Sequence, residues 1–333
     1  MAEERIKWID WVKGFTMFLV VFGHICSGLY NSGRFLESEY YISLMYDLIS
    51  GIRMPLFFLM SGLLYYTKVN NNKRELKNSI LKKLISLGIP YIIFSVFVWF
   101  LKYFMGSNVR IVLDWTDLLL IPIKPIEYLW FLYALLLIFI IVEVLDYVFK
   151  NNIIVLCIVF AITIICWSYP TESYLLNQTM RMITFFYMGK MLRQNIAIFK
   201  DPLFFILCIS AYIILQYVNI VTDNTERSFN FVIAMAGAFA VLGIAVRLNE
   251  KSAFFRYFCK IGKITMPVYL LHPPIASATR MFLLKIGIEN IIVHFVLGFL
   301  IVWFLTMGIY KIASKFKYGD FLFYPGKYIK IKT

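Results

Sequence analysis

Long apolar stretches alternate with short polar ones along nearly the whole chain. Each apolar stretch has about 20 residues, enough for an α-helix to cross a hydrocarbon core roughly 30 Å thick. A backbone in lipid must satisfy its own hydrogen bonds, so we expect helices, and the period-two alternation of a membrane barrel is absent. The pattern predicts an all-α integral membrane bundle of about ten transmembrane helices, at residues 11–30, 41–66, 80–104, 128–149, 152–168, 177–193, 203–221, 229–247, 264–284 and 290–314.

The composition agrees with a membrane protein. Of the 333 residues, 61% are apolar and 16% are charged, whereas a soluble domain carries roughly 25% charged residues. The first apolar stretch follows Lys13 directly and lacks a small-residue cleavage site, so we interpret it as a retained first helix and not a signal peptide. The polar connections are too short to hold a second folded unit, so residues 1–333 are predicted to form a single membrane domain.

The connection at residues 104–127 is one of the longest in the chain. It contains Trp115, Pro122 and Pro125, and it leads into Glu127. Irregular backbone at membrane depth is tolerated where protein buries it, so this connection is predicted to be a re-entrant or interfacial segment. No internal repeat is visible, which counts against an inverted-repeat transporter.

The net charge of +14 fits either a nucleic acid or a membrane surface, and the positions of the charges decide between them. With the N-terminus inside, 24 of the 33 Lys and Arg residues fall on the cytoplasmic side and six on the outer side. This asymmetry follows the positive-inside rule. It predicts a multi-pass protein of the plasma or inner membrane with both termini in the cytoplasm, basic residues facing anionic lipid, and no nucleic-acid partner.

Three polar side chains share the first predicted helix, in the stretch IDWVKGFTMFLVVFGHICSG. Asp10 and Lys13 are three residues apart, on adjacent turns of one face. Lys13 and His24 are eleven residues apart, so they share a face and lie roughly 16 Å apart along the axis. This face carries a cation at the cytoplasmic end and an imidazole inside the membrane, where ionisable groups are usually functional. The alternative is that Asp10 and Lys13 only end the helix and that His24 is structural.

Further polar side chains lie in or beside other predicted helices. Arg53, near the middle of the second helix, stays charged and needs a carboxylate, carbonyls or water. The alternative to a functional role is a structural ion pair with Asp47 or with an acid on another helix. Glu127 and Trp130 share one helix face at the outer interface, although an aromatic belt also explains Trp130.

A second histidine precedes two prolines in the ninth predicted helix. Tyr269 and His272 lie one turn apart, and Pro273 and Pro274 must break or bend the helix and free backbone groups there. His294, in the last helix, has no partner that the sequence identifies, and we interpret it as structural. The five cysteines show no CxxC spacing, which argues against a disulfide framework or a cysteine metal site.

These blocks together resemble the membrane-bound acyltransferase 3 family, in particular its fucose 4-O-acetylase-like branch of polysaccharide O-acetyltransferases. They occur in the family's order, from about residue 5 to 315. The matching blocks are ID-x2-K-x10-H (Ile9, Asp10, Lys13, His24), MPLFFLMSG at 54–62, WFL at 130–132, Arg181 with FFYMG at 185–189, and the G-x-x-(S/T)-x-x-(V/I)-YLLH-P pattern from Gly262 to Pro273.

The chain departs from the family pattern at two places. Lys82 and Lys83 stand where arginines of an R-x-x-R are common, and Arg53 stands where this branch often has a histidine. Arginine binds phosphate as a planar fork and lysine as a point charge, so the two are not equivalent there.

The resemblance implies transfer of an acyl group, usually acetyl from acetyl-CoA, to a hydroxyl of a cell-surface or lipid-linked glycan, with no permanently bound cofactor and no metal. The catalytic candidates are His24, Asp10 and Arg53, with His24 as general base or acyl carrier and Arg53 or a freed backbone N–H at the oxyanion. The cationic candidates for the phosphates of acyl-CoA are Lys13, Lys73, Arg74, Lys82 and Lys83. The acceptor candidates are Glu127, Trp130, Arg181, Tyr269, His272 and Arg280.

Two other functions stay open. The donor could be succinyl-CoA or another acyl-CoA in place of acetyl-CoA. The protein could instead be a glycan or lipid exporter, in which the buried histidines and arginines form a proton or substrate path. The aligned pair Lys13 and His24, together with the basic inner side, favours acyl-CoA chemistry, because an exporter does not need them.

Overall fold

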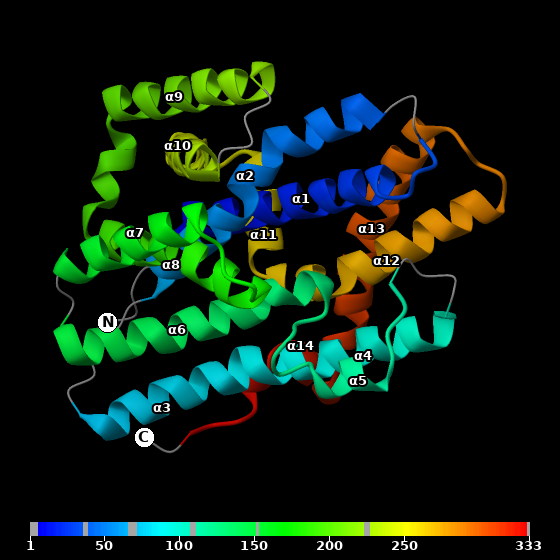
Figure 1. Ribbon diagram of the computed structural model, residues 1–333, viewed down its shortest axis with the longest axis horizontal. Coiled ribbons are helices and arrows are strands. Elements are labelled where there is room, and N and C mark those ends of the chain that lie inside the picture. The colour runs from blue at the N-terminus through cyan, green and yellow to red at the C-terminus, as the bar shows by residue number, and fades with distance from the viewer. Residues whose placement is uncertain are drawn as a thin grey trace. The chain divides into compact units, whose positions relative to one another are not determined.

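The computed structural model describes residues 6–35, 39–65, 72–106, 111–150, 153–222 and 227–331, and within these ranges the regular structure is entirely helical (Figure 1). The chain divides into two compact units. Unit 1 comprises Met1–Tyr66 with Phe185–Gly308, and unit 2 comprises Thr67–Thr184 with Ile309–Thr333. Each unit therefore combines segments that lie far apart in the sequence.

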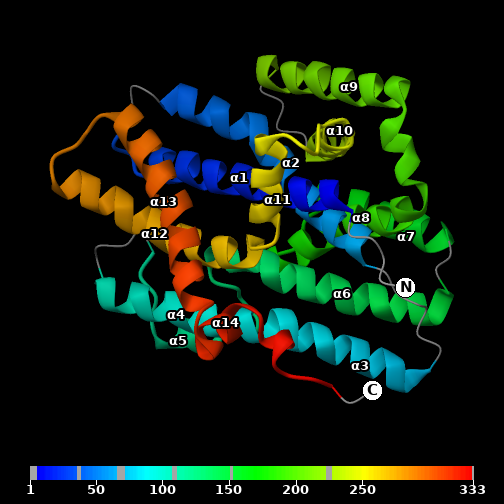
Figure 2. The same cartoon turned by 180° about the vertical axis from the view of Figure 1, so that it is seen from behind.

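Unit 1 is built around α1, which contacts α2, α10, α11 and α12. Figure 2 shows α11 running across α1. The helices of this unit are α1 (Lys7–Tyr30), α2 (Glu39–Leu64), the end of α8 (Tyr174–Leu192), η5 (Arg193–Lys200), α9 (Pro202–Val221), α10 (Arg227–Ala245), α11 (Ala253–Gly262), α12 (Thr265–Lys285) and most of α13 (Ile291–Ala313).

Two glycines allow α11 to cross α1 with the backbones in contact. A Cβ added at Gly14 would overlap the carbonyl oxygen of Phe258, and a Cβ added at Gly262 would overlap that of Asp10. The Phe258 ring then packs edge-on against Phe15, at 5.7 Å between ring centroids. The sequence block that contains Asp10 is thus packed against the block that begins at Gly262.

A second pair of glycines joins α2 to the end of α8. A Cβ at Gly62 would overlap the carbonyl oxygen of Phe186, and a Cβ at Gly189 would overlap that of Leu59. The close approach is reciprocal, so neither glycine can be replaced without separating the helices. Two of the sequence blocks, MPLFFLMSG at 54–62 and FFYMG at 185–189, therefore pack against each other.

Unit 2 contains one long helix with a single π-helical turn, formed by α3, η2 and α4. The elements of this unit are α3 (Lys73–Lys83), η2 (Leu84–Gly88), α4 (Ile89–Met105), α5 (Trp115–Leu119), η4 (Glu127–Leu129), α6 (Trp130–Phe149), α7 (Ile153–Ser168), the start of α8, the end of α13, α14 (Lys317–Phe323) and η6 (Pro325–Lys327).

The connection that contains α5 folds back along α4. The Trp99 indole N–H donates to the Asp114 carbonyl at 2.7 Å, and the Tyr91 hydroxyl donates to the Ile121 carbonyl at 2.5 Å. Tyr91 is about 21 Å from Met105 at 1.5 Å per residue, so the connection returns most of the length of α4. This is the path expected of a re-entrant segment, and its position in a membrane stays a prediction.

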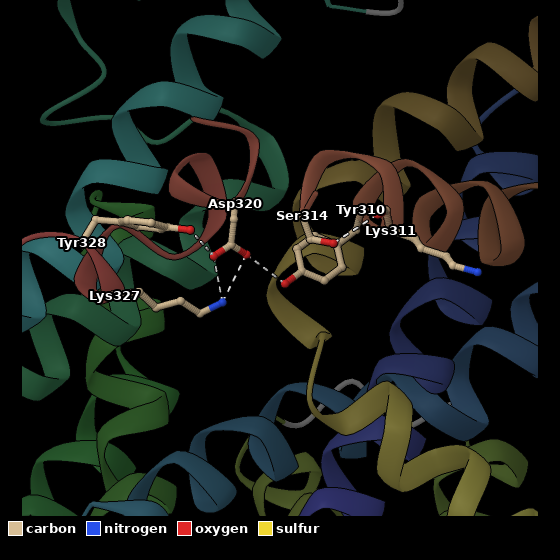
Figure 3. A network of polar contacts seen from close by, with 6 residues as sticks. All are labelled: Tyr310, Lys311, Ser314, Asp320, Lys327 and Tyr328. Carbon is tan, nitrogen blue, oxygen red and sulfur yellow. Dashed lines mark hydrogen bonds and ion pairs between the residues drawn. The ribbon is translucent and has the colours of Figure 1, made fainter. Parts of the chain in front are cut away.

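The C-terminal tail is anchored through one buried carboxylate (Figure 3). Asp320 accepts hydrogen bonds from Lys327 Nζ at 2.9 and 3.1 Å, from the Tyr328 hydroxyl at 3.0 Å and from the Tyr310 hydroxyl at 3.1 Å. Phe323 of the same tail packs against Phe94 of α4, at 5.4 Å between ring centroids. The tail is therefore tied both to the end of α13 and to α4.

Among the described residues, each of the ten predicted transmembrane stretches contains a helix, but these helices differ in length and in polarity. Six helices among the described residues are long and apolar enough to cross a membrane, and the helices at Ile153–Ser168 and Asn230–Ala245 are apolar but shorter. The helices α8 and α12 have 19 and 21 residues but carry polar side chains such as Arg181, His272 and Arg280. The structure thus supports a multi-pass membrane bundle, and the number of ten spans stays a prediction.

Candidate active site

Two histidines from distant parts of the sequence meet in unit 1. The ring of His24, on α1, lies edge-on to the ring of His272, on α12, with 4.7 Å between their centroids and an interplanar angle of 71°. His272 is 0% exposed, whereas His24 is only partly buried. His24 is therefore the more accessible member of the pair.

The orientation of His272 follows from the proline beside it. Pro273 has no N–H, so the helical hydrogen bond to the carbonyl of Tyr269 cannot form. The Nδ1 atom of His272 lies 2.8 Å from that carbonyl oxygen and 3.1 Å from that of Val268. A carbonyl oxygen only accepts, so Nδ1 carries the hydrogen and donates, and Nε2 holds the lone pair of the neutral ring.

Arg53 reaches α1 beside His24 because residue 23 is a glycine. A Cβ at Gly23 would overlap Arg53 Nη1. The guanidinium carbon lies 4.7 Å from the centroid of the Tyr46 ring, a cation–π contact. The Nη1 atom is buried and has no hydrogen-bond partner among the residues that the structure describes. A buried N–H donor thus remains available beside the histidine pair.

A second arginine lies against the next turn of α1. A Cβ at Gly28 would lie 2.5 Å from Arg280 Nη1, and Gly28 follows His24 by one turn on the same face. Tyr269 belongs to the same group, since its ring lies 6.0 Å from that of His272. Of the six residues predicted to contact the acceptor, the structure brings Tyr269, His272 and Arg280 to the His24 centre.

Asp10 and Lys13 lie at the other end of α1. The Asp10 carboxylate is buried and is 4.0 Å from Lys13 Nζ. The helix α1 runs without interruption from Lys7 to Tyr30, so the roughly 16 Å expected between Lys13 and His24 along the axis applies. The structure therefore separates Asp10 from His24, although both were predicted to be catalytic.

The cations predicted in residues 73–83 belong to unit 2 and differ in exposure. Lys73, Arg74 and Lys82 are exposed. Lys83 is partly buried, and its Nζ lies 3.9 Å from the centroid of the Phe139 ring on α6. Three of the four are thus open to a phosphate group, and the fourth is directed at α6.

Two buried acids on α6 were missed by the sequence interpretation. Glu143 is 1% exposed and accepts a hydrogen bond from the Ser79 hydroxyl, and Asp146 is 2% exposed. They are three residues apart in a predicted transmembrane stretch, where ionisable groups are costly. That rule, applied to residues 128–149, would have identified both.

The remaining acceptor candidates also belong to unit 2. Glu127 forms an ion pair with Lys102. The Trp130 ring lies 6.0 Å from that of Tyr174, edge-on. The guanidinium carbon of Arg181 lies 5.6 Å from the centroid of Trp167. Each has a neighbour that explains its position, and a contact of any of them with the acceptor stays a prediction.

His294 has a contact that fits a structural role. Its Nε2 lies 2.7 Å from the carbonyl oxygen of Ile288, in the connection between α12 and α13. The ring also lies edge-on to Phe35, at 5.1 Å between centroids.

Among the described residues, no group of three His, Cys, Asp or Glu side chains could hold a metal ion.

Comparison with known proteins identifies a family for this chain. A protein-family model described as an acyltransferase domain, Acyl_transf_3, matches residues 6–311, nearly the whole chain. No curated protein matches the chain, and no solved structure matches it. The match includes the segments that carry His24, Arg53 and His272, but it does not identify a branch of the family.

Proposed function

The chain belongs to the acyltransferase 3 family and is a multi-pass membrane acyltransferase, and from this premise we propose that it transfers an acetyl group from acetyl-CoA to a hydroxyl of a polysaccharide. The acceptor is an extracytoplasmic or lipid-linked glycan, as the resemblance to the fucose 4-O-acetylase-like branch implies. The observation that carries the proposal is the partly buried His24 beside the buried Nη1 donor of Arg53.

The chemistry needs a base and an oxyanion donor. The unprotonated nitrogen of His24 takes the proton of the acceptor hydroxyl while its oxygen attacks the thioester carbonyl carbon. Arg53 donates an N–H to the carbonyl oxygen as it gains negative charge. The C–S bond then breaks, and the thiolate of CoA takes the proton from His24. The products are an O-acyl ester and CoA, and the enzyme returns to its starting state. The geometry is equally compatible with an acyl-His24 relay.

The donor reaches His24 from the inner end of α1. CoA is a polyanion in the cytoplasm, and Lys13 supplies a cation at that end. The axial separation of roughly 16 Å between Lys13 and His24 is comparable with an extended phosphopantetheine arm. The exposed cations of unit 2, Lys73, Arg74 and Lys82, are further candidates for the phosphates. A role for Lys83 is less favoured because it is directed at Phe139.

A purified preparation tests the proposal. The protein is incubated with acetyl-CoA labelled in the acetyl group and with glycan from its own membranes, and thiol release and label in the glycan are measured. Succinyl-CoA forms a parallel arm. His24→Ala should lower turnover by roughly 10²–10⁴-fold, the usual contribution of a general base. His294→Ala is the matched control, since it also removes a buried histidine and should change turnover little.

Protein levels in the membrane decide how a loss is interpreted. If the His24→Ala protein is present at normal levels and acylates glycan at the wild-type rate, the proposed mechanism is wrong. If the wild type consumes no acyl-CoA at all but moves glycan across vesicle membranes, the exporter function replaces it.

A further inference from the structure

We propose that His272 is a positioning residue that fixes the tautomer and orientation of His24. The inference rests on the proposed function, because it assigns how the catalytic base is held. From the sequence, His272 is predicted only to contact the acceptor glycan. Its surroundings in the structure support a different role, for which the HPP sequence in α12 supplies the physical reason.

The first step is the proline. Pro273 removes the N–H that would bond to the Tyr269 carbonyl, and His272 Nδ1–H takes its place at 2.8 Å. Leaving a buried carbonyl without a partner costs free energy, so this hydrogen bond holds the Nδ1–H tautomer of His272 in place. The Nε2 atom then keeps the lone pair of the neutral ring and can accept a hydrogen bond.

The second step is the neighbour on α1. The His24 ring lies 4.7 Å from the His272 ring at an angle of 71°, and the contact that we propose between them is a hydrogen bond from an N–H of His24 to the lone pair of His272 Nε2. When that N–H donates to His272, the other nitrogen of His24 must be the unprotonated one. When His24 takes the acceptor's proton, the same contact stabilises the imidazolium, as the third member of a catalytic triad does.

Burial assigns the two roles. His272 is 0% exposed, with Nδ1 committed to its own helix, so it is poorly placed to meet a substrate. His24 is partly buried and lies beside Arg53. His24 is therefore the group that contacts the substrate, and His272 acts through it.

Two substitutions separate the roles of the two ring nitrogens. His272→Gln can place an acceptor oxygen where Nε2 lies, whereas His272→Asn can place an N–H donor where Nδ1 lies but has no acceptor that reaches His24. We expect His272→Asn to lower kcat by about 10–10²-fold, as loss of an orienting partner does for histidines that bind metals. We expect His272→Gln to recover most of that loss, with KM for acetyl-CoA unchanged in both. Equal loss in both variants at normal protein levels would overturn the proposal.

A pair of proline substitutions tests the origin of the tautomer. Pro273→Ala restores an N–H for the Tyr269 carbonyl and should release His272 Nδ1. We expect kcat to fall, as it does in His272→Asn. Pro274→Ala is the matched control, because it alters the same helix but acts on the carbonyl of Leu270. Equal kcat in the two variants would contradict the proposed source of the orientation.

A measurement of the histidine tautomers by NMR, which does not depend on enzyme turnover, completes the test. The chain has three histidines, so ¹⁵N labelling of histidine and substitution of each in turn assigns the ring resonances by subtraction. We expect His272 to be protonated at Nδ1, and His24 to lose its single preferred tautomer in His272→Asn. Protonation of His272 at Nε2 in an active wild type would overturn this inference alone. Absence of acyl transfer by the wild type would overturn the proposed function instead.

Discussion

At the scale of single residues, the absence of a side chain at Gly23 allows the guanidinium group of Arg53 to lie beside His24. Arg53 lies against α1 only because Gly23 has no Cβ, and its Nη1 is buried without a partner among the described residues. An arginine at membrane depth is costly, and an N–H held in this way is preorganised for a developing oxyanion. The glycine is thus as necessary to the proposed chemistry as the arginine.

Gly23→Ala tests this arrangement. The new Cβ overlaps the far end of a flexible side chain, so the guanidinium group should move while the fold is kept. We expect normal expression and a fall in kcat of roughly 10²–10³-fold, the effect of removing one oxyanion donor. Gly51→Ala is the control, since a Cβ there meets nothing within 4 Å. Unchanged kcat in Gly23→Ala would show that Arg53 is not the oxyanion donor.

Single-residue chemistry could be predicted from the sequence only in part. The rule that ionisable groups in a membrane are functional selects His24, Arg53 and His272. Their meeting could not be predicted, because it depends on the register between α1 and α12, which leaves no periodic signal in either helix. The separation of Asp10 from His24, by contrast, follows directly from their spacing on one continuous helix.

At the scale of elements, helix positions follow from hydropathy, but helix contacts do not. The predicted stretches are helical, whereas α11 was assigned to a connection. The spacing of Phe255, Phe258 and Ile261 along one face, opposite Arg256 and Lys260, is an amphipathic pattern that could have identified it. Its contact with α1 depends on glycines whose role is visible only once the helices are placed.

The seam between α2 and α8 gives a prediction at this scale. Gly62→Ala places a Cβ against the backbone oxygen of Phe186, which cannot rotate away, so the two helices must separate. We expect a loss of stability of about 1–3 kcal/mol, typical of overpacking, visible as a lower thermal midpoint in detergent. Gly308→Ala, with nothing within 4 Å of its Cβ, should be neutral or slightly stabilising, because alanine favours helix. An unchanged midpoint in Gly62→Ala would contradict the close packing.

The C-terminal tail supplies a pH dependence. Burial alone would raise the pKa of Asp320, but hydrogen bonds from Lys327, Tyr328 and Tyr310 hold that pKa below its usual value. A lowered pKa means that the carboxylate stabilises the fold above its unfolded pKa, near 3.9, and that this contribution is lost as the pH falls through the folded pKa. The tail should therefore stay docked at neutral pH and loosen only in strong acid.

Asp320→Asn should remove this pH dependence. Hydrogen exchange in residues 317–331, corrected for the intrinsic rate, should be faster than in wild type at about pH 7. The two rates should converge only in strong acid, below the folded pKa of Asp320, which itself lies below the unfolded value of about 3.9. Tyr318→Phe is a control in the same tail, because Tyr318 is exposed. Equal exchange in wild type and Asp320→Asn at neutral pH would show that the carboxylate does not hold the tail.

At the scale of the whole molecule, each compact unit is assembled from segments that are distant from one another in the sequence. The structure divides into two compact units, each discontinuous in sequence, and the single membrane domain stays a prediction. Hydropathy carries no information on which helices pack together, so this division could not be predicted. What hydropathy and charge do predict is the path of the chain across the membrane, on which the proposed supply of acyl-CoA from the cytoplasm depends.

Labelling of single cysteines tests that path. In a background that lacks the five native cysteines, Asn72→Cys, Glu172→Cys and Lys251→Cys place thiols in three connections. Ten crossings with both termini inside put positions 72 and 251 in the cytoplasm and position 172 outside. If only the six long apolar helices crossed, position 172 would lie inside and position 251 outside. We therefore expect a membrane-impermeant maleimide to label intact cells at position 172 alone, and labelling at position 251 would eliminate the ten-helix path.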